Sequence, residues 1–156
     1  MVIMSIKRIK YYIIDIMCIA LLFGTSIYLL ISWNNLPDKI PGHYDALGNI
    51  DRWGSKYELI VLPIIAWIMF IGISVLERFP KAWNTGVKVT EENAYRVYST
   101  LYDMIKTLKL MLVIIFSFLT INSIHMTNLP TIFLPIMLIL IFGNLIYHLI
   151  KLHRVK

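Results

Sequence analysis

Four long apolar runs divide the chain, and each is long enough to cross a membrane. They cover residues 11–33, 57–76, 108–125 and 130–149. A helix rises about 1.5 Å per residue and the hydrocarbon core of a bilayer is about 30 Å thick, so about 20 apolar residues are enough to span it. The pattern therefore predicts an all-α membrane protein, a single integral membrane domain over residues 1–156 with four transmembrane helices.

Two polar segments interrupt the apolar runs. Residues 34–56 join the first two runs, and residues 77–107 join the second and third. At the end of the first segment, Ser55 and Glu58 match a capping box, in which the serine accepts from an early helix N–H and the glutamate reaches back. This loop is therefore expected to lead directly into the second helix.

The middle of the first polar segment carries turn signals. Asp45-Ala-Leu-Gly48 is typical of a tight turn, with an acceptor side chain at its start and a glycine where φ is positive. Such a turn would fold Ile40–Tyr44 back onto Asn49–Trp53. The loop is thus predicted to form a short hairpin between two membrane helices.

The second polar segment predicts an amphipathic helix. Thr90 is a suitable N-cap, and the pattern continues to Lys106 and into the third apolar run. Aromatic side chains fall on one stripe of this helix: Tyr95, Tyr98 and Tyr102. Such a helix is expected to lie on the membrane or under the bundle. The alternative is that the tyrosine stripe docks a cytoplasmic regulator.

Composition and charge support a membrane protein and exclude other classes. The chain is 58% hydrophobic and 15% charged, and its mean hydropathy is +0.72. The net charge of +6 does not indicate nucleic-acid binding, because the basic residues flank the apolar runs. Twelve of them fall on the side of the termini and three in the 34–56 loop, so both termini are expected in the cytoplasm. Cys18, the single cysteine, is expected to serve in packing.

Few ionisable residues lie inside the apolar runs. Asp15 is close to one end of the first run, where we expect it to pair with a basic residue of the N-terminus: Lys7, Arg8 or Lys10. This scarcity of buried charge argues against a proton relay or ion pathway. Three polar residues of the last two runs are expected to hydrogen-bond between helices: Asn122, Asn144 and His148.

The 34–56 loop also carries a resemblance to a known family. Leu36-Pro37, Ile40-Pro41, Trp53-Gly54 and Ser55-Lys56, together with three single residues, match the pattern: His43, Asp45 and Gly48. A weaker match begins at Val89-Thr90-Glu91-Glu92-Asn93. The chain resembles the bacterial membrane domain of unknown function found at the N-terminal end of SdpI-type immunity proteins, which protect a cell against its own secreted toxin peptide. The resemblance implies a multi-pass protein of the bacterial plasma membrane.

The loop contains side chains that could bind a metal ion or act in catalysis. His43 and Asp45 would share one face of a strand, and Asp51 or His125 could join them as nitrogen and oxygen ligands. No recognised metal spacing or nucleophile motif is present, and Asp51 can equally pair with Arg52 or Lys56. A metal-dependent membrane enzyme using His43 and Asp45 therefore remains an alternative, as does a small transporter subunit.

The leading hypothesis is binding without a cofactor. In it, the loop recognises a peptide toxin or another membrane protein, in immunity or envelope signalling. The residues expected to bind the ligand are His43, Tyr44, Asp45, Asn49, Asp51, Trp53 and Lys56. The other expected partners are the lipid bilayer and a cytoplasmic regulator.

Overall fold

The computed structural model describes the backbone of residues 8–155 and the side chains from Lys10 onward. Its four long helices are α1 (Arg8–Ser32), α2 (Val61–Leu76), α3 (Ala94–Ile124) and α4 (Phe133–Arg154). Each belongs to a segment that is long and apolar enough to cross a membrane, and large apolar side chains are exposed along all four. The prediction of a four-helix membrane protein is confirmed.

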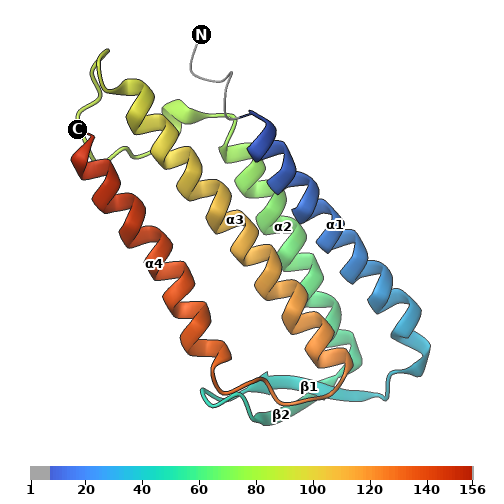
Figure 1. Cartoon of the computed structure of the whole chain (residues 1–156). Coiled ribbons are helices and arrows are strands. Elements are labelled where there is room, and N and C mark those ends of the chain that lie inside the picture. The colour runs from blue at the N-terminus through green and yellow to red at the C-terminus, as the bar shows by residue number, and fades with distance from the viewer. Residues whose placement is uncertain (1–7, 156) are drawn as a thin grey trace.

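Helix α3 is the centre of the bundle (Figure 1). It packs against α1 and α2, which also contact each other, and α4 packs mainly against α3. The N- and C-terminal ends of the described chain lie together at one end of the bundle. We call this the terminal end, and the opposite end, which carries the strands, the hairpin end.

The strands form the predicted antiparallel hairpin. They are β1 (Lys39–Tyr44) and β2 (Ile50–Ser55), and Ile40 lies opposite Gly54. The predicted capping box is present: the Ser55 hydroxyl accepts from the backbone N–H of Tyr57, and Glu58 accepts from the backbone N–H of Ser55. It begins a short 3-10 helix, Lys56–Ile60, that leads directly into α2. Strand, cap and membrane helix therefore follow one another without a flexible linker.

The predicted continuation of the amphipathic helix into the third span is confirmed, because residues from Ala94 to Ile124 form one helix of 31 residues. Its placement differs from the expected position on the membrane surface, since α3 packs into the bundle. Thr90 lies before this helix, in a turn where its hydroxyl accepts from the N–H of Asn93. Helix α4 also differs, since it begins at Phe133 and continues to Arg154. Pro135 consequently lies in the first turn of α4, where a missing N–H costs little.

Candidate functional site

The turn of the hairpin is held by Asp45. Its Oδ1 accepts from the backbone N–H groups of Leu47 and Asn49, each at 2.8 Å, and its Oδ2 accepts from the Asn49 side chain at 3.0 Å. These hydrogen bonds hold the pKa of Asp45 below its ordinary value, and the bond from the Asn49 side chain has the largest effect. Gly48 takes the positive φ of 86° that the turn requires. The predicted turn is confirmed, and both Asp45 oxygens are used within it.

Polar side-chain contacts join the two strands and the 3-10 helix that precedes α2. His43 Nδ1 lies 2.7 Å from Asp51 Oδ1. Arg52 pairs with Glu58 at 3.0 Å and also donates to the Gly42 carbonyl at 2.7 Å. The expectation that Asp51 pairs with Arg52 or Lys56 was therefore wrong. The bulge between Pro41 and His43 shifts the register and sets His43 opposite Arg52.

The hairpin is fastened to the connection between α3 and α4. Leu129 N–H donates to the Gly48 carbonyl at 2.8 Å, and Ile50 N–H donates to the Asn128 side chain at 3.0 Å. The Tyr44 hydroxyl lies 3.2 Å from Ser123 Oγ and accepts from Asn122 at 3.1 Å. These bonds hold the hairpin as a fixed cap over the end of α3.

The residues proposed for a metal-dependent reaction do not come together. His43 lies on β1 and faces Asp51, whereas Asp45 lies beyond the strand in the turn. His125 contacts the Tyr28 hydroxyl instead, with its Nε2 3.2 Å away. Among the described residues, no group of three His, Cys, Asp or Glu side chains is placed to hold a metal ion.

Two apolar side chains of the hairpin remain exposed. Trp53 on β2 is 51% exposed, and Leu47 in the turn is 63% exposed. Lys56, by contrast, is largely covered, because its Nζ lies 5.7 Å from the centre of the Trp33 ring and 3.7 Å from Asp38. Of the seven predicted ligand-binding residues, His43, Asn49, Asp51 and Trp53 are exposed. The contacts that shape the hairpin involve Tyr44, Asp45, Asn49 and Lys56.

Beneath the hairpin lies a cleft of about 740 Å³. The run from Ile40 to Ala46 forms the wall on the hairpin side, and the charged side chains Arg52 and Glu58 also line the cleft. The remaining walls are mostly apolar and come from the 3-10 helix, the ends of α2, α3 and α4, and the α3–α4 connection: Leu59, Val61, Leu62, Leu119, Ser123, Leu129, Phe133 and Leu134. Sequence periodicity could not reveal this cleft, because its walls lie far apart in the chain.

The terminal end of the bundle holds a buried network of four charges. Asp15 lies 2.6 Å from the Nζ of both Lys106 and Lys109. Glu77 lies 2.9 Å from Lys106 and 2.8 Å from Lys109. The expectation that Asp15 pairs with Lys10 was wrong, because Lys10 lies beside Asp103 instead. The other predicted partners, Lys7 and the Arg8 side chain, lie outside the described residues.

This charge network also places more charge inside the bundle than the expected scarcity of buried charge implied. The side chains of Lys106 and Lys109 are 2% and 0% exposed, and Glu77 is 7% exposed. The network connects α1, α3 and the end of α2. Of the predicted interhelical hydrogen bonds, that of Asn144 with Thr107 is present at 2.7 Å. Asn122 instead bonds to the hairpin and to Thr127, and His148 bonds within its own helix.

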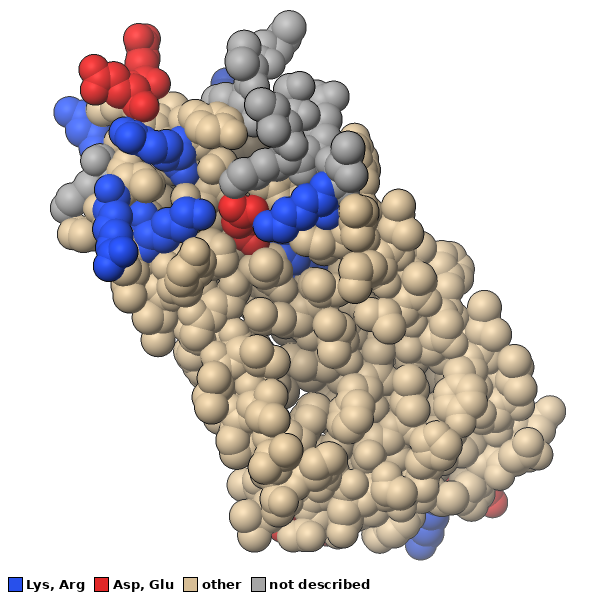
Figure 2. All heavy atoms as spheres, in the orientation of Figure 1, with Lys and Arg blue, Asp and Glu red and all other residues tan. Residues whose placement is uncertain are grey.

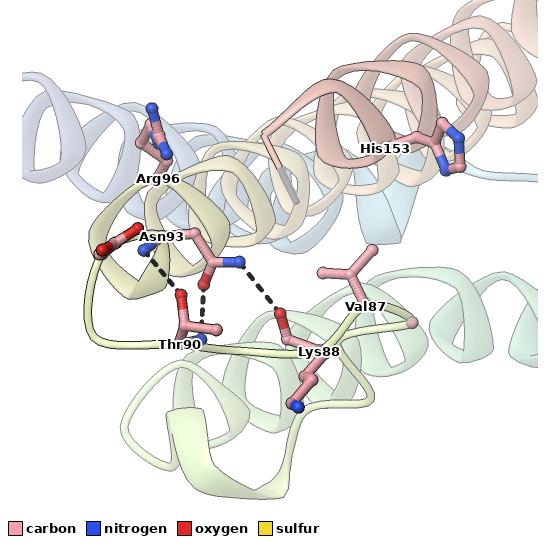
Figure 3. A pocket seen from close by; sticks show the side chains of 8 residues that line it. Val87, Lys88, Thr90, Asn93, Arg96 and His153 are labelled. Carbon is pink, nitrogen blue, oxygen red and sulfur yellow. Dashed lines mark hydrogen bonds between the residues drawn. The ribbon is translucent and has the colours of Figure 1, made fainter.

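The predicted tyrosine stripe is mostly engaged within the protein. Tyr98 and Tyr102 pack beside Trp83, and Tyr102 also meets Tyr11 edge to face. Tyr95 is 45% exposed. A pocket of about 620 Å³ lies nearby, but the side chains of Lys88, Arg96 and His153 around it point away from one another (Figure 3). The Asn93 side chain accepts from the Thr90 backbone N–H and donates to the Lys88 carbonyl.

A comparison with known protein families finds a match in the part of the chain that forms the hairpin end. A family model described as "Domain of unknown function (DUF1648)" matches residues 20–67. An uncharacterised protein of Archaeoglobus fulgidus is 33% identical over 79 residues, which cover 46% of this chain and 42% of that protein. No solved structure matches. The chain is therefore similar to this family of membrane domains from the middle of α1, through the hairpin, to the first turns of α2.

Proposed function

We propose that the hairpin end faces the cell exterior and that the hairpin recognises a peptide or another membrane protein. The proposed role is binding, in immunity against a toxin peptide or in envelope signalling. Three side chains make the proposed contacts: Trp53, Leu47 and the His43 imidazole paired with Asp51. The proposed location is the bacterial plasma membrane, with both termini in the cytoplasm.

Charge distribution supports this orientation. Lysine and arginine gather at the terminal end, whereas the middle of the bundle shows almost no charge and few basic side chains mark the hairpin end (Figure 2). Membrane proteins retain their lysine- and arginine-rich loops in the cytoplasm. The hairpin would then be displayed outside.

The observation that carries the proposal is an exposed tryptophan on a rigid support. Trp53 is 51% exposed, although β2 is held by β1, by the Ser55 cap and by Asn128. Large aromatic side chains on well-ordered elements are preferred anchors of protein interfaces, because little conformational entropy is lost on binding. The His43–Asp51 pair beside this strand adds polar groups that can select a partner.

The family resemblance supports a binding role in immunity. The matched residues 20–67 include the whole hairpin. The immunity part of the proposal rests on the resemblance of the loop sequence, with its prolines, glycines and Trp53, to the domain of SdpI-type immunity proteins. The matching region covers only 42% of the archaeal relative. Any function of that whole protein is therefore extended to this chain only as part of the proposal. Tyr95 is the exposed member of the tyrosine stripe and is proposed to meet a cytoplasmic regulator.

The test uses cells that express the full chain and are challenged with the secreted peptide fraction of its source organism. Trp53→Ala is expected to abolish protection while the amount of protein in the membrane stays the same. Tyr57→Ala is the matched control, since Tyr57 is an exposed aromatic residue (66%, against 51% for Trp53) at the same end but lies outside the hairpin. Equal protection by wild type and Trp53→Ala would contradict the proposal.

Orientation is tested separately. Ala46→Cys places a thiol in the exposed turn, and the native Cys18 is buried. A membrane-impermeant maleimide is expected to label Ala46→Cys in intact cells and to leave wild type unlabelled. Labelling that appears only after the cells are opened would place the hairpin in the cytoplasm.

A further inference from the structure

We propose that the cleft beneath the hairpin binds a zwitterionic phospholipid, with one acyl chain between α2 and α4 and the headgroup beside Arg52 and Glu58. Trp53 and Leu47 do not line this cleft, whereas His43 of the proposed recognition surface does. The inference rests on three observations: the depth of the cleft, the composition of its walls and the charges at its rim.

The first observation concerns depth. Trp33 and Tyr57 meet edge to face at 5.6 Å, and Lys56 lies over Trp33. Tryptophan, tyrosine and lysine in such a cluster are typical of the membrane–water interface. The cleft begins at this level with Leu59 and Val61 and continues along the helices toward the membrane interior. It therefore lies where headgroups give way to hydrocarbon.

The second observation concerns the walls. Val61 lines the cleft and is 50% exposed, so the cleft is continuous with the outer surface of α2. Across from it stand Phe133 and Leu134 of α4, and Leu119 of α3 forms the floor. Helix α4 packs mainly against α3, which leaves the side between α2 and α4 open. Because a membrane surrounds this opening, an acyl chain is the apolar group available to fill it.

The third observation concerns the rim. Arg52 and Glu58 lie side by side, 3.0 Å apart, and their side chains are 54% and 45% exposed. A guanidinium and a carboxylate in adjacent positions match the phosphate and the ammonium group of phosphatidylethanolamine. An anionic headgroup has a phosphate for Arg52 but no cationic group for the Glu58 carboxylate. Charge complementarity therefore favours the zwitterionic lipid.

The experiment measures lipid retention by the purified full chain in native mass spectrometry. The protein is given equal amounts of phosphatidylethanolamine and phosphatidylglycerol with the same acyl chains. Wild type is expected to retain phosphatidylethanolamine about tenfold better than phosphatidylglycerol, a ratio that one charge-assisted contact can supply. Equal retention, or a preference for phosphatidylglycerol, would overturn the assignment of the headgroup.

Variants separate the cleft from nonspecific lipid around the bundle. Leu119→Trp fills the floor of the cleft and is expected to lower retention of phosphatidylethanolamine about tenfold, as is Leu134→Trp, which fills it from α4. Ile121→Trp is the matched control, because Ile121 is 37% exposed on α3 and does not line the cleft. Unchanged retention in both cleft variants would refute the site. Two variants are used so that the test remains decisive if one of them folds poorly.

The headgroup contact is tested by Glu58→Gln. Glutamine retains the capping interaction with the Ser55 backbone but removes the negative charge. The selectivity is expected to shift toward phosphatidylglycerol while total retention persists. Glycerophosphoethanolamine, which has no acyl chain, is expected not to compete. Competition by that headgroup alone would show a site for a soluble phosphate compound.

Discussion

Lys109 Nζ lies 2.8 Å from Glu77 Oε1, and both side chains are withdrawn from solvent. Lysine and glutamate are seldom buried within a membrane bundle unless each compensates the charge of the other. Here the pair closes a network with Asp15 and Lys106, so that α1 and α3 are joined to the end of α2 by opposite charges.

Removing one member of this network is expected to destabilise the bundle. Lys109→Met leaves an excess buried carboxylate and should lower the free energy of unfolding by about 3–5 kcal/mol. The double variant Lys109→Met/Glu77→Gln restores the charge balance around Asp15 and Lys106, and much of the stability should return. Thermal unfolding in detergent measures both, and Lys88→Met, in the exposed loop, is the control. Additive losses in the double variant would show that the two residues act independently.

Gly48 is expected to be intolerant of substitution. It has a φ of 86°, and an added Cβ would collide with the Leu129 backbone. Gly48→Ala should therefore detach the hairpin from the α3–α4 connection and accelerate hydrogen exchange at Leu129. Gly143→Ala is the control, since no neighbouring atom lies within 4 Å of an added Cβ in the middle of α4. There the change should be neutral or stabilising by up to about 1 kcal/mol.

The hairpin turn is expected to weaken only in strong acid. Hydrogen bonds hold the folded pKa of Asp45 below its ordinary value of 3.8. The contribution of this carboxylate is therefore complete above pH 3.8 and is lost as the pH falls through the lowered pKa. Amide exchange at Leu47 and Asn49, followed against pH, measures the transition. Asp45→Asn should remove the pH dependence, and its persistence would assign it to another group.

Tyr44→Phe is expected to loosen the contact between the hairpin and α3. The variant loses the hydroxyl that meets Ser123 and Asn122 but retains the ring. A loss of about 1 kcal/mol is typical for one such hydrogen bond. Thermal unfolding provides the measurement, and Tyr57→Phe is the control because Tyr57 is 66% exposed. Equal effects of the two changes would show that the buried hydroxyl has no special role.

Local features of the hairpin end could be predicted because their determinants are close in sequence. Asp45, Gly48 and the Ser55–Glu58 cap act on residues no more than four positions away, and each prediction is confirmed. The four membrane spans could be predicted equally well, because hydropathy depends only on consecutive residues.

Long-range contacts escaped the sequence analysis. Asp15 and Lys106 are separated by 91 positions, and nothing near Asp15 distinguishes this lysine from the basic residues of the N-terminus. Lys106 was predicted to end a polar, amphipathic stretch of helix, whereas in α3 both Lys106 and Lys109 are buried in the bundle. The cleft depends in the same way on the gap between α2 and α4, which no local pattern encodes.

The order of the charge network along the chain bears on biogenesis. Asp15 and Glu77 are synthesised before Lys106 and Lys109, so both carboxylates are in place when α3 leaves the ribosome. The two lysines can then pair with these carboxylates as α3 inserts, and we expect efficient insertion of α3 to require α1 and α2. Helix α4 carries no part of the network and can join last.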